Sequence, residues 1–177
     1  MSDFEIETER LALRKHLISD FDDSFAMWSD PVVTRFIGGK PSTEQQAWSR
    51  LLNYAGHWSL LGFGYWAVVE KATQQFIGEV GFANFRRGFE PAMSDFPELG
   101  WAFATPYHGK GYATEAVRAA LAWADTRFDS RTVCLIDAEN LTSIRVAQKC
   151  GYTEFKQTLF NARSTKFFQR LPESRGR

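Results

Sequence analysis

The stretch that decides the fold is Thr105–Ala116, which reads Thr-Pro-Tyr-His-Gly-Lys-Gly-Tyr-Ala-Thr-Glu-Ala. It lies between an apolar strand pattern that ends near Ala104 and a helical pattern that begins near Tyr112. Gly109 and Gly111 permit a left-handed backbone or a close approach to a ligand. The backbone N–H groups of such a turn, with those at the start of the helix, form a cradle for an anion. We predict a phosphate-binding turn; an ordinary strand-to-helix connector is the alternative.

Two other phosphate motifs fit this stretch poorly. A P-loop needs Ser or Thr after Gly-Lys, but Lys110 is followed by Gly111. A dinucleotide-binding fingerprint needs a third glycine at position 114, which is Thr114, although Asp137 ends the next strand at a suitable distance. Only 66 residues follow Gly111, too few for the second half of a doubly wound sheet. Both motifs are therefore disfavoured.

The flanking motifs carry a specific resemblance. They are Glu98–Ala104, the Gly109–Ala116 turn and helix start, Asn140–Ser143, Lys149–Tyr152 and the opening Thr8–Arg14. Together they resemble the GNAT superfamily of acyl-CoA-dependent N-acyltransferases, and within it the branch of the RimJ and RimL ribosomal-protein N-terminal acetyltransferases. The resemblance implies an α/β (α+β) fold, with a mixed, mostly antiparallel sheet of six to seven strands flanked by helices.

Composition agrees with one globular domain over residues 1–177. The chain is 44% hydrophobic, and its 21 Lys and Arg balance 21 Asp and Glu. No overall field therefore attracts nucleic acid or an acidic membrane, and we expect small molecules or peptide segments as partners. Cys134 and Cys150 have no metal-binding spacing, which favours reduced, packed thiols. With no signal-like N-terminus or apolar run of 18 residues, the sequence predicts a cytoplasmic protein without a bound metal.

Hydrophobic periodicity predicts alternating strands and helices. Most aromatic residues of the first two helices are expected in the core, and the resemblance assigns a minority to the acceptor pocket. The loop 86–97, with Phe89, Glu90, Met93 and Asp95, is either functional or a solvated excursion. The expected strands are 5–14, 65–69, 76–85, 98–104, 132–138 and one or two within 152–171; the expected helices begin after Asp20, at a Ser42/Gln45 capping box, near Ala113 and after Asn140.

The strand 98–104 has two different faces. Leu99, Trp101 and Phe103 share one face, while the other carries Glu98 among small residues. The small residues leave space beside the carboxylate. The resemblance implies that this strand splays from its neighbour, and that its exposed peptide groups bind the pantetheine arm of acetyl-CoA.

The resemblance also implies which residues bind the co-substrate. Pro106 replaces a Gln or Arg that is frequent in the family, so the turn relies on its backbone N–H groups. The implied acetyl-CoA-binding residues are Trp101, Ala102, Phe103, His108, Gly109, Lys110, Gly111, Tyr112, Ala113, Thr114, Asn140 and Ser143.

Acyl transfer to an amine needs a base, a polarised carbonyl and a proton for the leaving thiolate. Glu98 stands where many family members carry a general base that acts through water; a strand-end salt bridge is the alternative. The N–H of Phe103 or a neighbour can bond the thioester oxygen. Ala147 occupies the place of the family's usual acidic tyrosine, so Ser143 is the predicted proton donor, with helix capping or phosphate binding as the alternatives. Neither His57 nor His108 is assigned a catalytic role.

The sequence therefore predicts transfer of an acetyl group from acetyl-CoA to a primary amine. A protein N-terminal α-amine leads, because its pKa of about 7.7–8.0 leaves roughly a tenth of it neutral at pH 7, far more than a lysine amine. A small-molecule amine is the second acceptor class. An acyl-CoA-binding module without turnover and a nucleotide-binding protein are the alternatives from other classes. A homodimer is implied by the resemblance alone.

Overall fold

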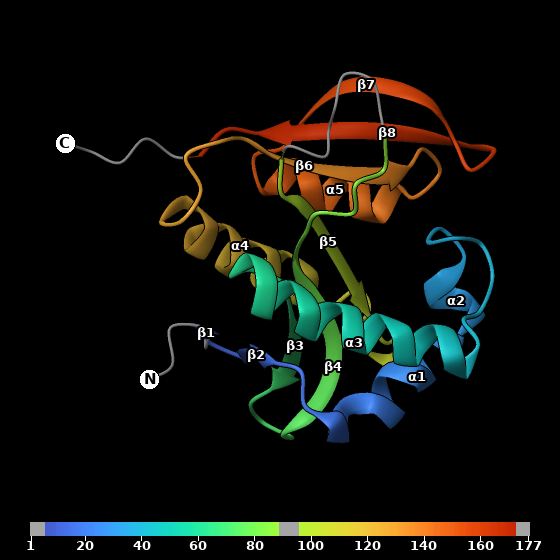
Figure 1. Ribbon diagram of the computed structural model, residues 1–177, viewed down its shortest axis with the longest axis vertical. Helices are drawn as coiled ribbons and strands as arrows, with labels where there is room; N and C mark the ends of the chain where they lie inside the picture. Colours follow the sequence, from blue (N-terminus) through green and yellow to red (C-terminus); the bar gives the residue numbers. More distant parts are fainter. Residues whose placement is uncertain (1–5, 89–95, 173–177) are drawn as a thin grey trace.

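The computed structural model describes residues 6–88 and 96–172 of the chain (Figure 1). Its centre is one eight-stranded sheet with the order β1-β2-β3-β4-β5-β6-β8-β7. Neighbouring strands are antiparallel except β5 and β6, which confirms the mixed, mostly antiparallel sheet. The strands are β1 Ile6–Glu7, β2 Leu11–Lys15, β3 Tyr65–Glu70, β4 Gln75–Ala83, β5 Glu98–Phe103, β6 Thr132–Asp137, β7 Thr153–Phe160 and β8 Arg163–Arg170.

The sheet has one strand more than the upper expected number. The single strand expected over 5–14 is instead two strands, β1 and β2, because the chain turns between them. The backbone N–H of Thr8 donates to the Leu11 carbonyl at 2.9 Å, and the Leu11 N–H donates to the Thr8 hydroxyl at 2.9 Å. Glu5, the expected start, lies outside the described residues. The segment 152–171 forms two strands, β7 and β8.

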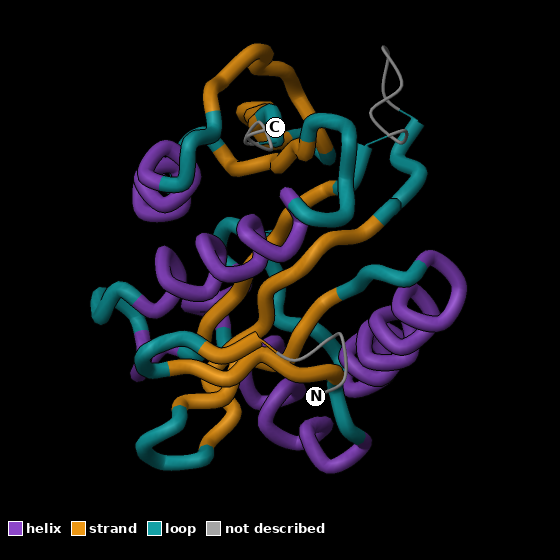
Figure 2. The backbone as a smooth tube through the Cα atoms, turned by 90° about the vertical axis from the view of Figure 1, so that its left-hand side faces the viewer, coloured by secondary structure: helices purple, strands orange, loops and turns teal. Residues whose placement is uncertain are grey.

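Helices cover both faces of the sheet (Figure 2). On one face, α1 buries Met27 and Trp28 against Ala67 and Ala102 of the strands. On the other face, α4 packs an apolar stripe on the sheet. The short α2 was not expected; Asp30 ends α1 and accepts from the Val32 N–H as the N-cap of α2. The helices are α1 Phe21–Ser29, α2 Pro31–Thr34, α3 Glu44–Leu61, α4 Tyr112–Asp125 and α5 Leu141–Lys149, with short 3-10 turns at Ile18–Asp20 and Thr105–Tyr107.

The capping box of α3 lies one residue later than expected. Thr43 and Gln46 form it: the Gln46 N–H donates to the Thr43 hydroxyl at 3.3 Å, and the Thr43 N–H donates to the Gln46 amide oxygen at 2.9 Å. The predicted pair at Ser42 is wrong, because the spacing of three residues fits both registers and the chain selects the second. Gly62 ends the helix in the left-handed conformation, with φ 73°.

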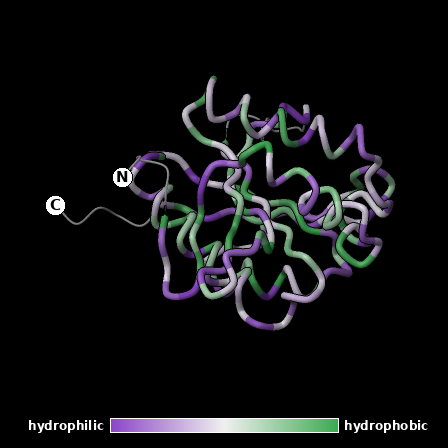
Figure 3. Tube along the Cα trace, turned by 90° about the horizontal axis from the view of Figure 1, so that it is seen from below, coloured by the Kyte–Doolittle hydropathy of each residue, from purple (hydrophilic) through white to green (hydrophobic). Residues whose placement is uncertain are grey.

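The core lies mainly between α4 and the sheet. Ala116, Ala120 and Ala124 on α4 are at most 1% exposed, which lets the helix approach the strands closely. An edge-to-face group of aromatic rings, among them Trp58, Trp66 and Trp123, adds about 0.5–1.5 kcal/mol per pair beyond the buried area. Figure 3 shows that many hydrophobic stretches of the chain pass through the middle of the molecule.

One loop and three further features singled out from the sequence remain to be placed in the structure. Phe89, Glu90, Met93 and Asp95 of the loop 86–97 lie outside the described residues. Among the described helices, none is long and apolar enough to cross a membrane. In the same part of the chain, no group of three or more His, Cys, Asp or Glu side chains is placed to hold a metal ion. Cys134 and Cys150 are buried free thiols, as expected.

Candidate active site

The parallel strands β5 and β6 separate almost as soon as they meet. Their only register pair is Glu98 with Val133, next to a 3.0 Å bond from the Val133 N–H to the Pro97 carbonyl. Each strand stays fully paired on its other side, β5 with β4 and β6 with β8. The expected splay is therefore present, and it leaves one edge of β5 open along most of its length.

The open edge presents the peptide groups of alternate residues. The Ala104 N–H donates to the Ile77 carbonyl of β4 at 2.9 Å. Along an antiparallel strand, successive residues point their N–H and carbonyl groups alternately toward and away from the partner strand. Since Ala104 points toward β4, the peptide groups of Ala102 do so too. Those of Trp101 and Phe103 point away from β4, toward the opening. The Phe103 carbonyl is 2.7 Å from Nε2 of His108. Of the three backbones predicted to bind the pantetheine arm, Trp101 and Phe103 face the opening.

The glycine turn follows β5 and leads into α4. Gly109 and Gly111 have φ of 74° and 83°, so both occupy the left-handed region that disfavours a side chain. Gly111 is the N-cap of α4 and provides no side-chain cap, and the first intrahelical donor is the Glu115 N–H. The N–H groups of residues 112–114 therefore have no acceptor within the helix. The turn has the open donors that an anion requires.

Arg10, in the bend between β1 and β2, fixes this turn. Its guanidinium donates to the Lys110 carbonyl at 3.0 Å and to the Glu115 carboxylate at 2.7 Å, and it lies 4.4 Å from the centre of the Tyr112 ring. The Thr8 hydroxyl donates to the same carboxylate at 2.6 Å. The opening Thr8–Arg14 motif thus holds the cradle in place, which sequence reasoning missed. The Tyr112 hydroxyl donates to Glu70, so Tyr112 can offer the turn its N–H but not its phenol.

A cavity of about 460 Å³ lies at the other end of β5. Glu98 and Phe103 are five residue steps apart, roughly 17 Å along the strand, and the cavity lining reaches from Glu98 to Trp101. The cavity brings together Glu98, Asn140 and Ser143 and is bounded by aromatic side chains. The described residues that line it include Trp28, Arg50, Tyr54, Tyr65, Arg87, Glu98, Gly100, Trp101, Asp137, Asn140, Ser143 and Arg163.

Glu98 is held by an arginine that the sequence did not indicate. Arg87 donates from Nε and Nη2 to the two carboxylate oxygens, each at 2.9 Å, and the Arg87 and Glu98 side chains are 30% and 14% exposed. The Arg87 guanidinium lies 4.5 Å from the centre of the Phe85 ring. Burial opposes the charge of Arg87, but the hydrogen bonds and charge of Glu98 outweigh it and raise the pKa of Arg87. The salt bridge given as the alternative for Glu98 is therefore present.

Tyr65 occupies the space expected beside Gly100. A Cβ at Gly100 would lie 2.0 Å from the Tyr65 hydroxyl, so the ring covers this glycine closely. The ring stacks on Tyr54 with centroids 4.5 Å apart. Burial, and then the charge of Glu98, raise the pKa of the Tyr65 phenol well above its ordinary value. Tyr65 therefore stays protonated at neutral pH and is a hydrogen-bond donor beside Glu98 that sequence reasoning missed.

The start of α5 contributes Asn140 and Ser143. Asn140 is the N-cap, and its amide oxygen accepts from the Ser143 N–H at 3.1 Å. The Ser143 hydroxyl borders the cavity and makes no hydrogen bond to the described residues. Ala147, where the family's tyrosine would stand, is fully buried. Asn140 therefore has the capping role, and the Ser143 hydroxyl is available to a ligand.

The remaining polar groups singled out from the sequence have structural partners. Asp137 binds Nε of Arg163 and accepts from the Glu139 N–H at 2.9 Å. His57 lies 2.9 Å from the Asn53 carbonyl through Nδ1 and accepts from the Asn84 N–H at 3.3 Å. These contacts agree with leaving His57 out of the catalytic residues.

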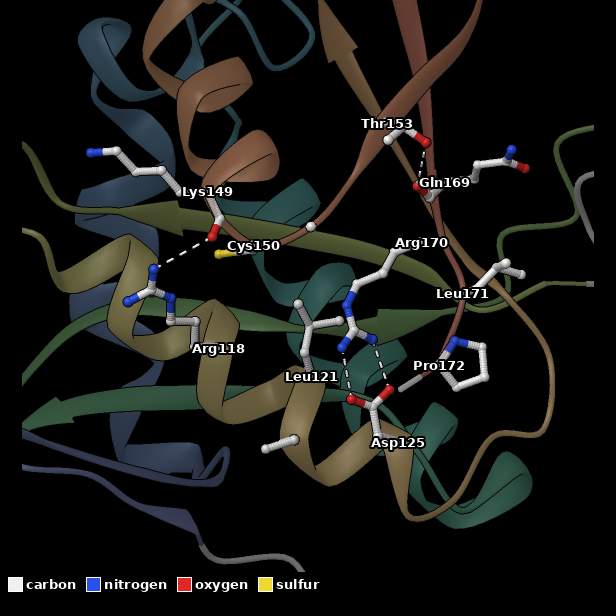
Figure 4. Close-up of a pocket in the computed structure, with 12 residues that line it drawn as sticks. Arg118, Leu121, Asp125, Lys149, Cys150, Thr153, Gln169, Arg170, Leu171 and Pro172 are labelled. Atoms are coloured by element: carbon white, nitrogen blue, oxygen red, sulfur yellow. Dashed lines mark hydrogen bonds and ion pairs between the residues drawn. The ribbon is translucent and has the colours of Figure 1, made fainter. Parts of the chain in front are cut away.

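A larger hollow of about 810 Å³ lies elsewhere, near the C-terminal ends of α4 and α5 (Figure 4). Arg170 donates to both oxygens of Asp125 at 2.7 and 2.8 Å, and Arg118 reaches the Lys149 carbonyl at 3.4 Å. No predicted site residue borders this hollow. It is also remote from the helix N-termini that carry the turn and Ser143, so its size does not make it the candidate site.

Comparisons with known proteins agree with this arrangement. Residues 10–153 match the family model described as an acetyltransferase (GNAT) domain. The Bacillus subtilis protein YkkB is 32% identical over 83% of this chain and 84% of its own length. A Bordetella pertussis protein assigned to the GNAT acetyltransferases has a solved structure that is 33% identical, covers 94% of this chain and 98% of its own, and superposes with a TM-score of 0.83.

A more distant structure shares the fold alone. RimL, described as a ribosomal L7/L12 α-N-protein acetyltransferase in complex with coenzyme A, is 13% identical to this chain. It covers 94% of this chain and 97% of its own, with a TM-score of 0.77.

Proposed function

The chain belongs to the GNAT acetyltransferase family, and on this premise we propose that it transfers an acetyl group from acetyl-CoA to a primary amine, with a protein N-terminal α-amine as the leading acceptor. The observation that carries the proposal is the open edge of β5, which joins the glycine turn at one end to the Glu98 cavity at the other. A small-molecule amine is the second acceptor class. The cytoplasmic location and the homodimer remain predictions.

The residues present fit a coenzyme A group. The N–H groups from Gly109 to Ala113 would bind its pyrophosphate, because they combine a left-handed turn with an uncapped helix start. The outward-facing peptide groups of Trp101 and Phe103 would pair with the amides of its pantetheine arm. When bound, acetyl-CoA supplies a thioester whose acyl carbon is open to attack by an amine.

Glu98 is proposed as the general base. Arg87 occupies one lone pair on each carboxylate oxygen, and the remaining lone pairs can accept from a water that takes the proton of the amine. An α-amine suits this arrangement, because roughly a tenth of it is already neutral at pH 7. A lysine side chain would require a much stronger base. The ion pair fixes the carboxylate rather than competing with its proposed role.

Two hydroxyl groups in the cavity complete the proposed machinery. The protonated Tyr65 phenol, which covers Gly100, can donate to an oxygen of the reacting groups. Ser143 is proposed to donate a proton to the leaving thiolate, since its hydroxyl is not bound to another described residue. Water is the alternative donor.

Release of free thiol from acetyl-CoA tests the proposal. The acceptor panel contains peptides with free N-termini, the same peptides with blocked N-termini and an internal lysine, and small amines. We expect acceptor-dependent release that is highest with free N-termini. If acetyl-CoA binds saturably and no acceptor causes release, the binding module without turnover is the better description. Competition by ATP or NAD at low micromolar concentration would instead support the nucleotide-binding alternative.

A further inference from the structure

Arg50 gives the cavity a cation without a carboxylate partner among the described residues. Three arginines and two carboxylates are among the described lining residues. Arg87 pairs with Glu98, and Arg163 pairs with Asp137. Within the described residues, the guanidinium of Arg50 makes one hydrogen bond, from Nη1 to the Ser42 hydroxyl at 3.3 Å. Most of its N–H donors are therefore open to a ligand.

The Arg50 guanidinium is held in place by stacking. Its central carbon lies 3.6 Å from the centre of the Trp28 ring. Trp28 is 5% exposed, and its indole N–H donates to Glu79 at 3.0 Å. Stacking on an immobile ring orders the planar guanidinium before a ligand arrives, which favours recognition of a flat anion such as a carboxylate.

Another carboxylate, that of Glu79, lies behind the aromatic side chains of Trp28 and Tyr54 in the cavity wall. Glu79 is 0% exposed and accepts from the hydroxyls of Ser24 at 2.7 Å and Tyr54 at 2.9 Å, besides the Trp28 indole. His16 lies 3.5 Å from the same carboxylate. Its oxygens are therefore used within the core, and they do not meet Arg50 at the cavity surface.

We propose that the acceptor amine carries a carboxylate, and that Arg50 binds this carboxylate while the amine lies near Glu98. The inference rests on the proposed function and narrows its substrate class. Both side chains border the same cavity of about 460 Å³, which limits the acceptor to a small molecule or the first residues of a peptide. A polyamine would place a further cation beside an arginine that has no counter-ion in the described part of the chain, so the cavity disfavours it.

The same chemistry has two sources that an experiment separates. The carboxylate is either the α-carboxylate of a free amino acid or the acidic side chain of a residue at a peptide N-terminus. Matched pairs distinguish them: an amino acid with its carboxamide, and a peptide that begins with Glu with one that begins with Gln. Spermidine serves as the polycationic comparison.

The test measures kcat/KM for each pair with the wild-type protein and with Arg50→Gln. For the wild type we expect kcat/KM to be about tenfold or more higher for the carboxylate member than for its uncharged match in one of the two pairs. This is the effect expected from the loss of a hydrogen bond to a charged group. The preference should disappear in Arg50→Gln, mainly through KM, while Arg50→Lys retains part of it. The matched control is Arg35→Gln, because Arg35 also lies over a ring, that of Phe36 at 5.0 Å, but does not border the cavity.

Two results would overturn the inference. One is equal kcat/KM for both members of both wild-type pairs, and the other is a preference for spermidine. If no acceptor is acetylated, the proposed function has failed, and calorimetric binding of the same pairs to the CoA-saturated protein decides the inference separately. Tighter binding of a carboxylate member that depends on Arg50 supports it, and equal binding within both pairs rejects it.

Discussion

The glycine turn after β5 and the cavity around Glu98 are built in opposite ways. The turn comes from one continuous stretch, and its donors are backbone N–H groups whose direction follows from the left-handed Gly109 and Gly111. The cavity is lined by side chains from most of the chain, between Trp28 and Thr165. A site made of backbone is readable from local sequence, whereas a site made of side chains depends on the tertiary fold. The difference also predicts that changes in the turn affect cofactor binding and changes in the cavity affect turnover.

The largest effect is expected for Glu98, where a substitution should reduce turnover without changing the binding of acetyl-CoA. Glu98→Gln keeps the shape but removes the base, so kcat/KM should fall about 10²- to 10⁴-fold. The dissociation constant of acetyl-CoA should stay the same, because the turn is unchanged. Steady-state thiol release and a binding titration measure the two quantities. Glu154→Gln is the matched control, since Glu154 pairs with Lys166 on the outer strands, outside the cavity lining. Unchanged turnover in Glu98→Gln would eliminate Glu98 as the base.

The second prediction concerns the contact between Gly100 and Tyr65. In Gly100→Ala the new Cβ would lie 2.0 Å from the Tyr65 hydroxyl, so the ring must move, and we expect a loss of about 1–3 kcal/mol of unfolding free energy. Turnover should fall as well, because the displaced ring reaches the proposed reaction centre.

A double variant tests whether this hydroxyl causes the loss. Tyr65→Phe combined with Gly100→Ala removes the 2.0 Å contact but leaves the ring carbon Cζ at 3.1 Å, so part of the stability should return. Denaturant unfolding of the single and double variants measures the coupling. Strictly additive losses would mean that the strain lies elsewhere. Tyr65→Phe alone should lower kcat about tenfold if the phenol donates to the reacting groups.

The third prediction examines the turn. Gly109→Ala meets no atom within 4 Å, so its effect comes only from the left-handed backbone, which costs a residue with Cβ about 1–2 kcal/mol. If the turn relaxes to avoid this cost, the dissociation constant of acetyl-CoA should rise roughly tenfold, with little change in kcat.

Gly56→Ala is the control for this variant. Gly56 also meets no atom within 4 Å, but it lies inside α3 with an ordinary backbone, so alanine there should stabilise the protein by about 0.5–1 kcal/mol. A drop in kcat at constant acetyl-CoA affinity in Gly109→Ala would contradict the assignment of the turn to cofactor binding.

The limits of sequence reasoning follow the same division. The α4 stripe was predictable from its periodicity, and the turn from its own glycines. The splay of β5 was implied by the family resemblance alone, because it depends on how β5 and β6 pair. Arg87 lies only 11 residues from Glu98, yet nothing local indicates that it turns back to pair with it. Tyr65 and Gly100 come from strands separated by β4, and their contact depends on the packing of a ring against a missing Cβ. The capping box of α3 was predicted one residue too early, because Ser42/Gln45 and Thr43/Gln46 have the same spacing.

The smallest effects are expected for two polar residues at the start of α5. Asn140 caps the helix, whereas Ser143 is proposed to take part in the reaction. Asn140→Ala removes the N-cap and should lower the unfolding free energy by about 1 kcal/mol. Ser143→Ala loses no side-chain hydrogen bond to the described residues, so stability should stay within about 0.5 kcal/mol. If Ser143 protonates the thiolate, Ser143→Ala should lower kcat about tenfold. The decrease in kcat should be smaller with an acyl donor whose thiol is more acidic, because a better leaving group needs less proton transfer. An unchanged kcat would assign that proton to water and leave Ser143 as a helix residue that borders the cavity.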